Sequence, residues 1–277
     1  MTDRSRAADR PPLTADAVAP LVAPRGPLAL AAVVDAEPST NTALATALRE
    51  DPGAWPHLAV YLADHQTAGR GRAGRVWETP RGTSLTLSWV LRPRATGTDL
   101  AWAPLVVGLA AVRALRSLGL DAWIKWPNDV VVRVDADDVA GWGSWRKVAG
   151  ILCEVVDDAV VAGTGINVLQ TADELPVPHA ASLASLGCEA SRLDVLGALG
   201  AALRETTAAW DDHPAAVRDE VEAVCATIGW DVAVDVGTAA PVTGTAVGLG
   251  ADGSLLVRSA SGRTTAVLAG DVRVRRA

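Results

Sequence analysis

The segment at residues 65–75, HQTAGRGRAGR, holds three arginines and three glycines within seven consecutive positions. Glycine gives the backbone access to conformations in which amide and guanidinium donors converge on one anion. Arginine is always charged, and its planar donors match the oxygens of phosphate and carboxylate groups. A solvated basic turn is the alternative for a surface segment of this kind. The density of arginine and glycine favours a loop that binds an anionic ligand.

The same segment satisfies the pattern G-x-G-x-x-G from Gly69 to Gly74, which marks dinucleotide sites when a helix follows directly. Here Pro80 and Gly82 follow and would break a helix, and the next stretch alternates as a strand does. A P-loop requires a Gly-Lys-Ser/Thr sequence, which this segment does not contain. The residues that follow the pattern therefore argue against both a dinucleotide-binding site and a P-loop.

Four other short motifs place polar residues beside apolar or turn-forming ones: STN at 39–41, KWPNDV at 125–130, KVAGIL at 147–152 and GTGINV at 163–168. Each has a plain structural interpretation. The STN motif could cap a helix, and Lys147 could be an edge residue whose stem lies along apolar surface. Asn128 and Asp129 could form a turn or a cap. On residue type alone these alternatives stay open.

The composition is that of a globular chain of 277 residues and 28.5 kDa, with 49% hydrophobic residues. A net charge of −7 and an isoelectric point near 5.1 argue against general nucleic-acid binding, which needs a broad basic face. Cys153, Cys188 and Cys225 lie far apart without a CxxC pair, so we expect a reduced, cytoplasmic protein. The sequence contains no secretory signal and no uninterrupted apolar run of membrane-spanning length, and we expect no membrane partner.

Hydrophobic periodicity predicts the elements that must position these residues. The predicted strands lie near residues 28–34, 57–66, 84–91 and 147–169, the last being a hairpin that turns at 157–158. Three helices are predicted. One begins at Ser39, another ends near Gly119, and the third begins at Ser191. Residues 84–91 alternate as a strand with one buried face. Hairpin strands with helices clustered between them favour an α+β fold with a mixed or antiparallel sheet over a doubly wound parallel one.

The amino-acid composition changes twice along the chain. Residues 1–24 are rich in charge and proline and are predicted to be a mobile tail, and residues 25–226 form the main domain. At 227–277, short Val-rich segments separated by glycines have no helical period, which predicts a small β-barrel. The Asp/Gly-rich stretch at 135–143 is predicted to be a mobile surface loop. The sequence leaves the role of the acidic loop at 133–146 open, between a contact with a partner protein and no role.

In this order along the chain, STN, HQTAGRGRAGRVW, KWPNDV, KVAGIL and GTGINV resemble the motifs of biotin protein ligases. The similarity continues through ASL at 181–183 and AGDV at 269–272, so it covers residues 26–277. Five motifs in one order are far harder to explain by coincidence than any one of them. The resemblance implies a class II synthetase-like catalytic domain and an SH3-like C-terminal barrel.

Biotin protein ligases join biotin to ATP, giving biotinoyl-5'-AMP and pyrophosphate, and then pass the biotinoyl group to a lysine of a biotin carboxyl carrier protein domain. Such carrier domains belong to acetyl- or acyl-CoA carboxylases and to pyruvate carboxylase. The resemblance thus implies a biotin–[biotin carboxyl-carrier protein] ligase that uses biotin and ATP, with Mg²⁺. No acidic cluster or histidine spacing predicts a metal held by protein ligands, which fits Mg²⁺ carried by phosphates and water.

By resemblance, the site residues form three overlapping groups. The implied catalytic residues are Arg72, Lys147 and Asp129, the last orienting the acceptor amine or receiving its proton. The residues implied to bind biotin are Ser39, Thr40, Asn41, Gln66, Gly69, Arg70, Gly71, Arg72, Lys147 and Gly150. Those implied to bind ATP or the adenylate are Arg72, Arg75, Trp77, Lys125, Asn128 and Asn167, with Trp77 as a stacking surface. Fixed cations would offset the repulsion between a carboxylate and a phosphate.

Some family members also carry an N-terminal DNA-binding domain. The short N-terminal tail here predicts a monofunctional ligase, with no DNA partner, that is a monomer or a weak homodimer. Two alternatives need separate tests. One is a lipoate or octanoyl transferase on a related fold, and the other is a biotin-sensing module that binds biotin without consuming ATP.

Overall fold

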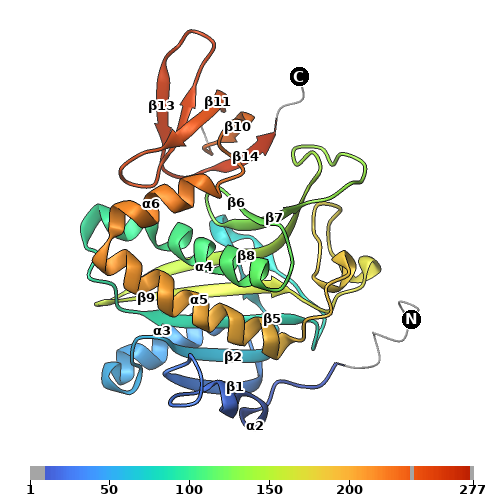
Figure 1. The fold of residues 1–277 in the computed structure, drawn as a ribbon, viewed down its shortest axis with the longest axis vertical. Helices are drawn as coiled ribbons and strands as arrows, with labels where there is room; N and C mark the ends of the chain where they lie inside the picture. Colours follow the sequence, from blue (N-terminus) through green and yellow to red (C-terminus); the bar gives the residue numbers. More distant parts are fainter. Residues whose placement is uncertain (1–9, 238–239, 275–277) are drawn as a thin grey trace.

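The computed structural model describes residues 10–237 and 240–274, and Figure 1 shows two sheets of unequal size. The larger sheet has seven strands in the order β1-β2-β5-β9-β8-β7-β6. These strands are β1 (Leu30–Glu37), β2 (Ala59–Gln66), β5 (Ser84–Leu91), β9 (Ala159–Asn167), β8 (Trp145–Val156), β7 (Asp129–Arg133) and β6 (Ala122–Lys125). β1 and β2 run parallel, and the five other neighbouring pairs are antiparallel. This mixed sheet with its helices confirms the predicted α+β class.

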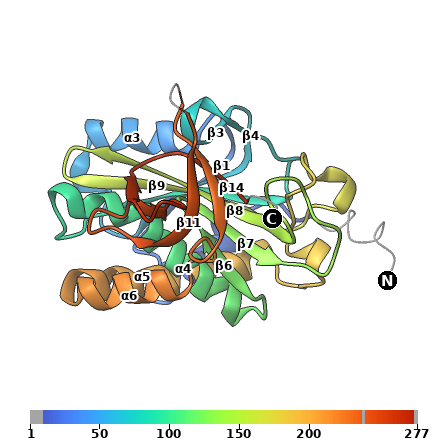
Figure 2. The same ribbon diagram turned by 90° about the horizontal axis from the view of Figure 1, so that it is seen from above.

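Helices cover both faces of the large sheet (Figure 2). One face carries α4 (Ala103–Ser117) and α5 (Arg192–Asp212), with α6 (Pro214–Ala223) beside them, and the other carries α3 (Thr40–Glu50). The main core lies under α4 and α5 and includes the fully buried Trp89, Leu109 and Leu199. Burial of each such side chain contributes about 1.5–3 kcal/mol, so this layer fixes the sheet on which the site is built.

The predicted start signals of two helices are confirmed. Ser39 has extended backbone, and its side chain accepts a hydrogen bond from the Thr42 amide at the N-terminus of α3. Ser191 and Asp194 form a reciprocal capping box at the start of α5. Both caps satisfy amides that a helix leaves unpaired in its first turn. The cap on α3 also fixes the direction in which residues 39–41 face the sheet.

β5 is buried on both faces, whereas its alternation predicted one buried face. Leu85, Leu87 and Trp89 belong to the core under α4 and α5. The alternate positions, among them Thr86 and Ser88, are also buried, and Ser88 contacts the start of α3. The polar residues of β5 therefore face a second protein layer instead of solvent.

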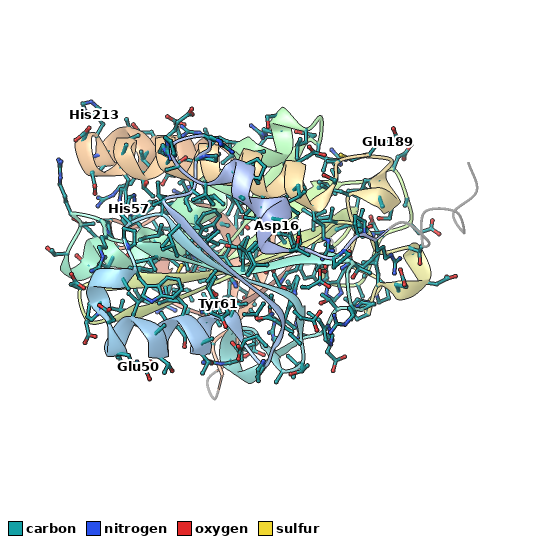
Figure 3. All side chains as sticks on the ribbon, turned by 90° about the horizontal axis from the view of Figure 1, so that it is seen from below. Asp16, Glu50, His57, Tyr61, Glu189 and His213 are labelled. Carbon is teal, nitrogen blue, oxygen red and sulfur yellow. The ribbon has the colours of Figure 1, made fainter. Side chains whose placement is uncertain are left out.

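The predicted mobile tail is wrong for residues 10–24. This segment contains α2 (Ala15–Val18) and the 3₁₀ turn η1 (Ala19–Leu21), and Figure 3 shows the α2 segment around Asp16 crossing the lower side of the molecule, beside β1. Leu13 and Val18 are buried in the main core, and the Leu13 amide donates to Asp64 Oδ1 at 2.9 Å. Residues 1–9 of the predicted tail lie outside the described residues.

The C-terminal sheet is antiparallel, with the strand order β13-β12-β11-β10-β14. Its strands are β10 (Asp231–Asp235), β11 (Val242–Leu249), β12 (Leu255–Arg258), β13 (Thr264–Val267) and β14 (Asp271–Val274). In the part of the chain that the structure describes, β13 and β14 are its two edges. The predicted small β domain is present, and its closure into an SH3-like barrel stays a prediction. The predicted boundary at 226/227 falls in the connection between α6 and β10.

The continuous helical stretch Gly97–Ser117, which joins the 3₁₀ turn η4 (Gly97–Trp102) to α4, has the length and mean hydropathy of a membrane-spanning helix. Within the fold, 67% of its apolar window is buried. Gly108 of α4 lies directly against Ile124 and Ile151 of the sheet. The apolar character of this helix is thus satisfied by packing on the sheet and α5. The remaining 3₁₀ turns outside the site are η2 (Pro52–Ala54), η5 (Ala172–Glu174) and η6 (Ala184–Leu186).

Candidate active site

A cavity of about 470 Å³ opens between the arginine segment, the α3 side of the large sheet and the C-terminal sheet. Fourteen of the sixteen residues predicted for the site line this cavity. They are Ser39, Thr40, Asn41, Gln66, Arg70, Gly71, Arg72, Arg75, Trp77, Lys125, Asn128, Asp129, Lys147 and Gly150. Gly69 and Asn167 are the two predicted residues that do not line it. Segments far apart in the sequence therefore meet in one place, as the resemblance implies.

The start of α3 and the end of β2 form a polar corner of the cavity. Thr40 donates from its backbone nitrogen and from Oγ1 to Gln66 Oε1, at 2.9 and 3.0 Å. These two bonds fix the Gln66 amide with its Nε2 group as the remaining donor, for which no described residue is the acceptor. The corner thus offers a fixed amide donor to a ligand, within a largely apolar wall.

Asn41 lines the same corner, but its side chain is already occupied. Its Nδ2 group donates to the Leu152 carbonyl at 3.0 Å and to Glu154 Oε2 at 2.8 Å, and its Oδ1 accepts from Ser88 at 2.6 Å. Both ends of the amide are therefore paired within the protein. The arrangement gives Asn41 the role of locking α3 onto β5 and β8, beside the predicted role of binding biotin.

The arginine segment is a tight hairpin. β3 (Gly69–Arg70) pairs with β4 (Val76–Trp77), and the 3₁₀ turn η3 (Arg72–Gly74) connects them. The turn places Ala73 in the left-handed region, with φ of 53°. A Cβ atom at Gly69 would lie 2.3 Å from the Trp77 carbonyl oxygen. Gly69 is thus required by the close approach of the two short strands, which explains its place in the motif although it does not line the cavity.

The three arginines of the hairpin have different partners. Arg70 Nη2 lies 2.9 Å from Glu154 Oε1, and Arg75 Nη2 lies 3.0 Å from Asp271 Oδ2. Arg72 is half-buried, and its Nη1 group donates to Asn128 Oδ1 at 3.4 Å, a long hydrogen bond. Burial lowers the pKa of Arg72, with opposing effects from nearby charges. Arg72 is therefore the hairpin cation that lacks a carboxylate at ion-pair distance among the described residues.

Glycines in β8 and β9 make the floor of the cavity. A Cβ atom at Gly165 would lie 2.6 Å from the Trp77 ring, and one at Gly150 would lie 3.2 Å from it. A Cβ atom at Gly163 would meet the Asn41 amide at 2.3 Å. The floor therefore accepts the indole of Trp77 and the start of α3 only because side chains are missing there.

Two lysines and one aspartate form the charged end of the cavity. Lys125 and Lys147 are the two lysines of the whole chain. Lys147 Nζ lies 2.5 Å from Asp129 Oδ1, and Lys125 Nζ lies 3.9 Å from Asp129 Oδ2. Register explains the meeting, because Lys125 pairs with Asp129 across β6 and β7, and Asp129 pairs with Gly150 across β7 and β8. One carboxylate is thus shared by two ammonium groups, which leaves an excess of positive charge.

Burial and charge act on this cluster in opposite directions. Burial raises the pKa of Asp129, but the Lys147 and Lys125 ammonium groups outweigh it and hold the pKa below its usual range. Burial lowers the pKa of Lys125, and the Asp129 carboxylate opposes that effect. Asp129 is therefore ionised at neutral pH, and an anion entering the cavity would relieve the excess of positive charge.

Asn128 and Asn167 support the site from its edges. Asn128 Nδ2 donates to the Ile151 carbonyl at 2.7 Å, so β8 orients the amide that contacts Arg72. Asn167 is buried, donates to the Ala181 carbonyl at 3.1 Å and accepts from Gln170 at 3.0 Å. Asn167 holds the segment after β9, and the geometry does not support the predicted direct nucleotide contact.

The C-terminal sheet supplies lining residues that the sequence did not assign to the site. These are Asp235, Val236, Gly237, Ala269, Gly270 and Asp271. The AGDV motif contains three of them and is the sequence signal for this wall of the cavity. Asp271 also pairs with Arg75, so the small domain closes one wall of the cavity and anchors the arginine hairpin. Glu154, the partner of Arg70 and Asn41, was also missed.

Within residues 10–237 and 240–274, no group of three or more histidine, cysteine or acidic side chains is arranged to hold a metal ion. Three carboxylates line the cavity: Asp129 and Asp271 are each paired with a cation, and Asp235 accepts from the Gly237 amide at 3.0 Å. Oxygen ligands for Mg²⁺ would therefore have to come mainly from phosphate groups and water, as is usual for nucleotide-bound Mg²⁺.

The fold and the cavity define a catalytic domain of the biotin and lipoate ligase class, and the Biotin/lipoate A/B protein ligase family matches residues 33–170. The sequence is 34% identical over 240 residues to the biotin–[acetyl-CoA-carboxylase] ligase of Mycobacterium tuberculosis, covering 84% of this chain and 85% of that protein. It is 32% identical over 242 residues to the ligase of the same name from Paracoccus denitrificans, covering 81% and 93%. The chain belongs to the biotin protein ligases.

A solved structure agrees with this assignment. The biotin protein ligase from Aquifex aeolicus, in complex with biotin and ATP, superimposes with a TM-score of 0.71 at 27% sequence identity. The match covers 90% of this chain and 99% of that one. Because 90% of this chain is matched, the similarity includes the large sheet and at least part of the C-terminal region.

Proposed function

We propose that this protein activates biotin with ATP to form biotinoyl-5'-AMP and then ligates the biotinoyl group to a lysine of a biotin carboxyl carrier protein domain. The observation that carries the proposal is the shared cavity: the arginine hairpin, both lysines and the glycine floor line one space. The ligases of M. tuberculosis and P. denitrificans are named for acetyl-CoA carboxylase, which supports a carboxyl carrier protein as the acceptor. Acyl-CoA and pyruvate carboxylase domains are included in the proposal.

Biotin binds at the polar corner and over the glycine floor. Its ureido group needs a few exact hydrogen bonds, and Ser39, Thr40 and Gln66 are the polar groups there. Its bicyclic ring and tail need apolar walls, which Trp77 and the floor at Gly150 supply. The carboxylate end then points toward Lys147 and the arginine hairpin, where the positive charge lies.

In the first step a biotin carboxylate oxygen attacks the α-phosphorus of ATP, and pyrophosphate leaves with the bonding electron pair. Charge develops on the phosphate oxygens while two anions approach each other. Arg72 and Lys147 are the cations proposed to stabilise this charge, with Arg70, Arg75, Lys125 and Asn128 around them. Preset donors of this kind typically contribute a factor of about 10²–10³ each.

In the second step the acceptor lysine amine attacks the acyl carbon, the acyl C–O bond breaks, AMP leaves with the bonding electron pair, and the amine releases one proton to solvent. Asp129 has a low pKa because Lys147 and Lys125 neighbour it, and it is bound to Lys147. A carboxylate held in this way is a weak base. The pairing favours a role in orienting Lys147 and the incoming amine over removal of the amine's proton.

Mg²⁺ accompanies ATP in this proposal. The ion neutralises phosphate charge when bound, and the paired state of Asp129 and Asp271 favours phosphate and water as its ligands. The isolated cysteines support a cytoplasmic location, because disulfides would be expected in an oxidising compartment. A monomer or weak homodimer without a DNA partner completes the proposal.

The test is a transfer assay with purified protein, biotin, ATP, Mg²⁺ and a carrier domain, beside the same carrier with its acceptor lysine replaced by arginine. We expect biotin on the first carrier and none on the second, and a biotinoyl-AMP peak by mass spectrometry when no carrier is added. Lipoate in place of biotin separates the ligase from a lipoate or octanoyl transferase. Biotin binding without biotinoyl-AMP would establish a sensing module and reject the proposal.

A further inference from the structure

The long connection between β7 and β8 is an ordered hairpin that places Trp142 beside the cavity. Val139 and Gly143 exchange backbone hydrogen bonds at 2.9 and 2.8 Å, so a second tight turn forms within the connection. The Arg146 guanidinium donates to the carbonyl oxygens of Asp137 and Gly143 at 2.6 and 3.0 Å. These bonds hold the loop in place, so the predicted mobility of residues 135–143 is wrong.

The Trp142 ring contacts two other side chains. It stacks on the imidazole of His179 with 4.3 Å between ring centroids and 11° between planes. His179 is held in turn, because its carbonyl accepts from the Lys147 amide at 2.7 Å. Burial and the Lys147 ammonium lower the pKa of His179, so this imidazole is neutral at pH 7. The stack thus brings an uncharged, rigid aromatic surface to the charged end of the site.

The second contact is with Lys125, whose Nζ lies 4.3 Å from the centroid of the Trp142 ring. The Lys125 side chain is 1% exposed, and its Asp129 partner is at 3.9 Å, beyond hydrogen-bond distance. Among the described residues, Nζ has no acceptor within hydrogen-bond distance: Lys147 binds Asp129 Oδ1, and the other oxygen, Oδ2, lies 3.9 Å from Lys125. A buried ammonium without hydrogen-bond acceptors is costly, and the indole face offsets part of this cost beside the Asp129 carboxylate.

We propose that Trp142 is a positioning residue for the nucleotide half of the reaction: its indole face holds the Lys125 ammonium in place, with its N–H donors free for an oxygen of the adenylate phosphate. Lys125 lines the cavity together with Lys147 and Arg72, which directs those donors to the same space. The proposal rests on the proposed function, because it names how one residue of that site is held. It also gives the loop at 133–146 a role that the sequence did not assign.

Two substitutions separate the aromatic face from simple bulk. W142F keeps a π face, whereas W142L keeps a large apolar side chain without one. We expect W142L to raise the KM for ATP in biotinoyl-AMP formation roughly 5- to 30-fold, and W142F to stay within roughly 3-fold of wild type. The dissociation constant for biotin should be unchanged in both, which also shows that the variants are folded.

A double-mutant cycle tests whether Trp142 acts through Lys125. In a K125M background, W142L and W142F should have equal KM values for ATP, because the interaction they differ in is already gone. W123A is the control. Trp123 lies on β6, as Lys125 does, but away from the cavity, and it also carries a cation over its ring, with Arg116 at 4.9 Å from the ring centroid. We expect W123A to leave the KM for ATP unchanged.

An NMR measurement gives a readout independent of activity. Because the chain has two lysines, spectra of protein labelled with ¹³C at lysine Cε contain two side-chain signals, which a K147R variant assigns. The indole should displace the Lys125 signal by its ring current in wild type and W142F, but not in W142L. Equal KM values for W142L and W142F with an active wild type would overturn the inference, as would a difference that persists with K125M. A wild type that forms no biotinoyl-AMP would instead reject the proposed function.

Discussion

The two walls of the cavity carry their positive charge in opposite ways. The floor as a whole is the part of the large sheet that holds both the glycines and the charged end of the cavity. In its charged end, Lys125 is 1% exposed and Asp129 12% exposed, and Lys147 shares that carboxylate with Lys125. In the arginine hairpin, Arg70 is 49% and Arg75 64% exposed, and each has a carboxylate of its own from another element. The floor is buried with an excess of cations, whereas the outer arginines of the hairpin are exposed and neutralised.

The difference indicates two functions for positive charge in one site. Buried charges are screened little by water and salt, so the floor is already arranged for an anion before the ligand enters. Exposed ion pairs contribute little free energy, typically 0–1 kcal/mol, so Arg70 and Arg75 can exchange Glu154 and Asp271 for ligand oxygens at small cost. The hairpin is thus suited to closing over a ligand that the floor holds.

The largest effect is expected from the floor. Lys147→Ala removes the cation closest to Asp129 and should slow single-turnover biotinoyl-AMP formation about 10²–10³-fold. Arg72→Ala, which removes the half-buried hairpin cation, should weaken formation or retention of the adenylate as well. Quenched-flow mass spectrometry measures both. Unchanged rates in both variants would contradict the assignment of these two cations and the comparison built on them.

The stability of the floor should depend on pH through Asp129. A carboxyl whose pKa is lower in the folded state stabilises the fold above its unfolded pKa, and this stability is lost as the pH falls through the folded value. At pH 7, Asp129→Asn should lower the free energy of unfolding by about 3 kcal/mol, because the buried Lys125 ammonium and the partly exposed Lys147 ammonium lose their carboxylate. The difference from wild type should narrow below about pH 4, where the unfolded carboxyl binds a proton.

Urea unfolding at a series of pH values measures this difference. The matched control is Asp158→Asn, because Asp158 forms an ion pair with Arg92 and is 76% exposed. That control should change the free energy of unfolding by no more than about 0.5 kcal/mol at either pH. Equal losses in Asp129→Asn and Asp158→Asn would mean that the floor is no more dependent on its buried charge than the surface is.

The glycine floor should be sensitive to a single methyl group. Gly165→Ala places a Cβ 2.6 Å from the Trp77 ring, so the ring must move into the space proposed for biotin. We expect roughly 10-fold weaker biotin binding by calorimetry, within the range typical of overpacked sites. Gly53→Ala, which meets only an ordinary 3.5 Å contact, is the control and should bind biotin normally.

The smallest effect is expected in the hairpin. Arg75→Ala and Asp271→Asn should each change the free energy of unfolding by less than about 1 kcal/mol, and a double-mutant cycle should find a coupling that added salt reduces. Thermal unfolding at low and high ionic strength measures it. A coupling as large as that of Asp129 with Lys147 would show that the two walls do not differ as described.

Much of the fold followed from local patterns. The cap at Ser39 and the capping box at Ser191 begin α3 and α5, and the predicted turn at 157–158 connects β8 to β9. These features depend on residues a few positions apart, which sequence patterns record directly. The docking of residues 10–24 did not follow, because Leu13 is held by Asp64, far along the chain.

Part of the site was also beyond the reach of the motifs. Trp142 lies in a loop whose acidic composition indicates only surface exposure, and its meeting with Lys125 depends on how β6, β7 and β8 are aligned. The occupied amide of Asn41 likewise depends on contacts with β5 and β8. These contacts join residues that are far apart in the sequence, so local sequence patterns do not record them.

The sequence by itself determined the kinds of group in the site, their order along the chain and the local elements that carry them. Only the tertiary structure decided that Lys125 and Lys147 would share one carboxylate while Arg70 and Arg75 would each have their own. It also decided that the C-terminal sheet would close the cavity. The physical reason is that the energy of a charge depends on its distance to other charges and on its burial, and folding alone sets both.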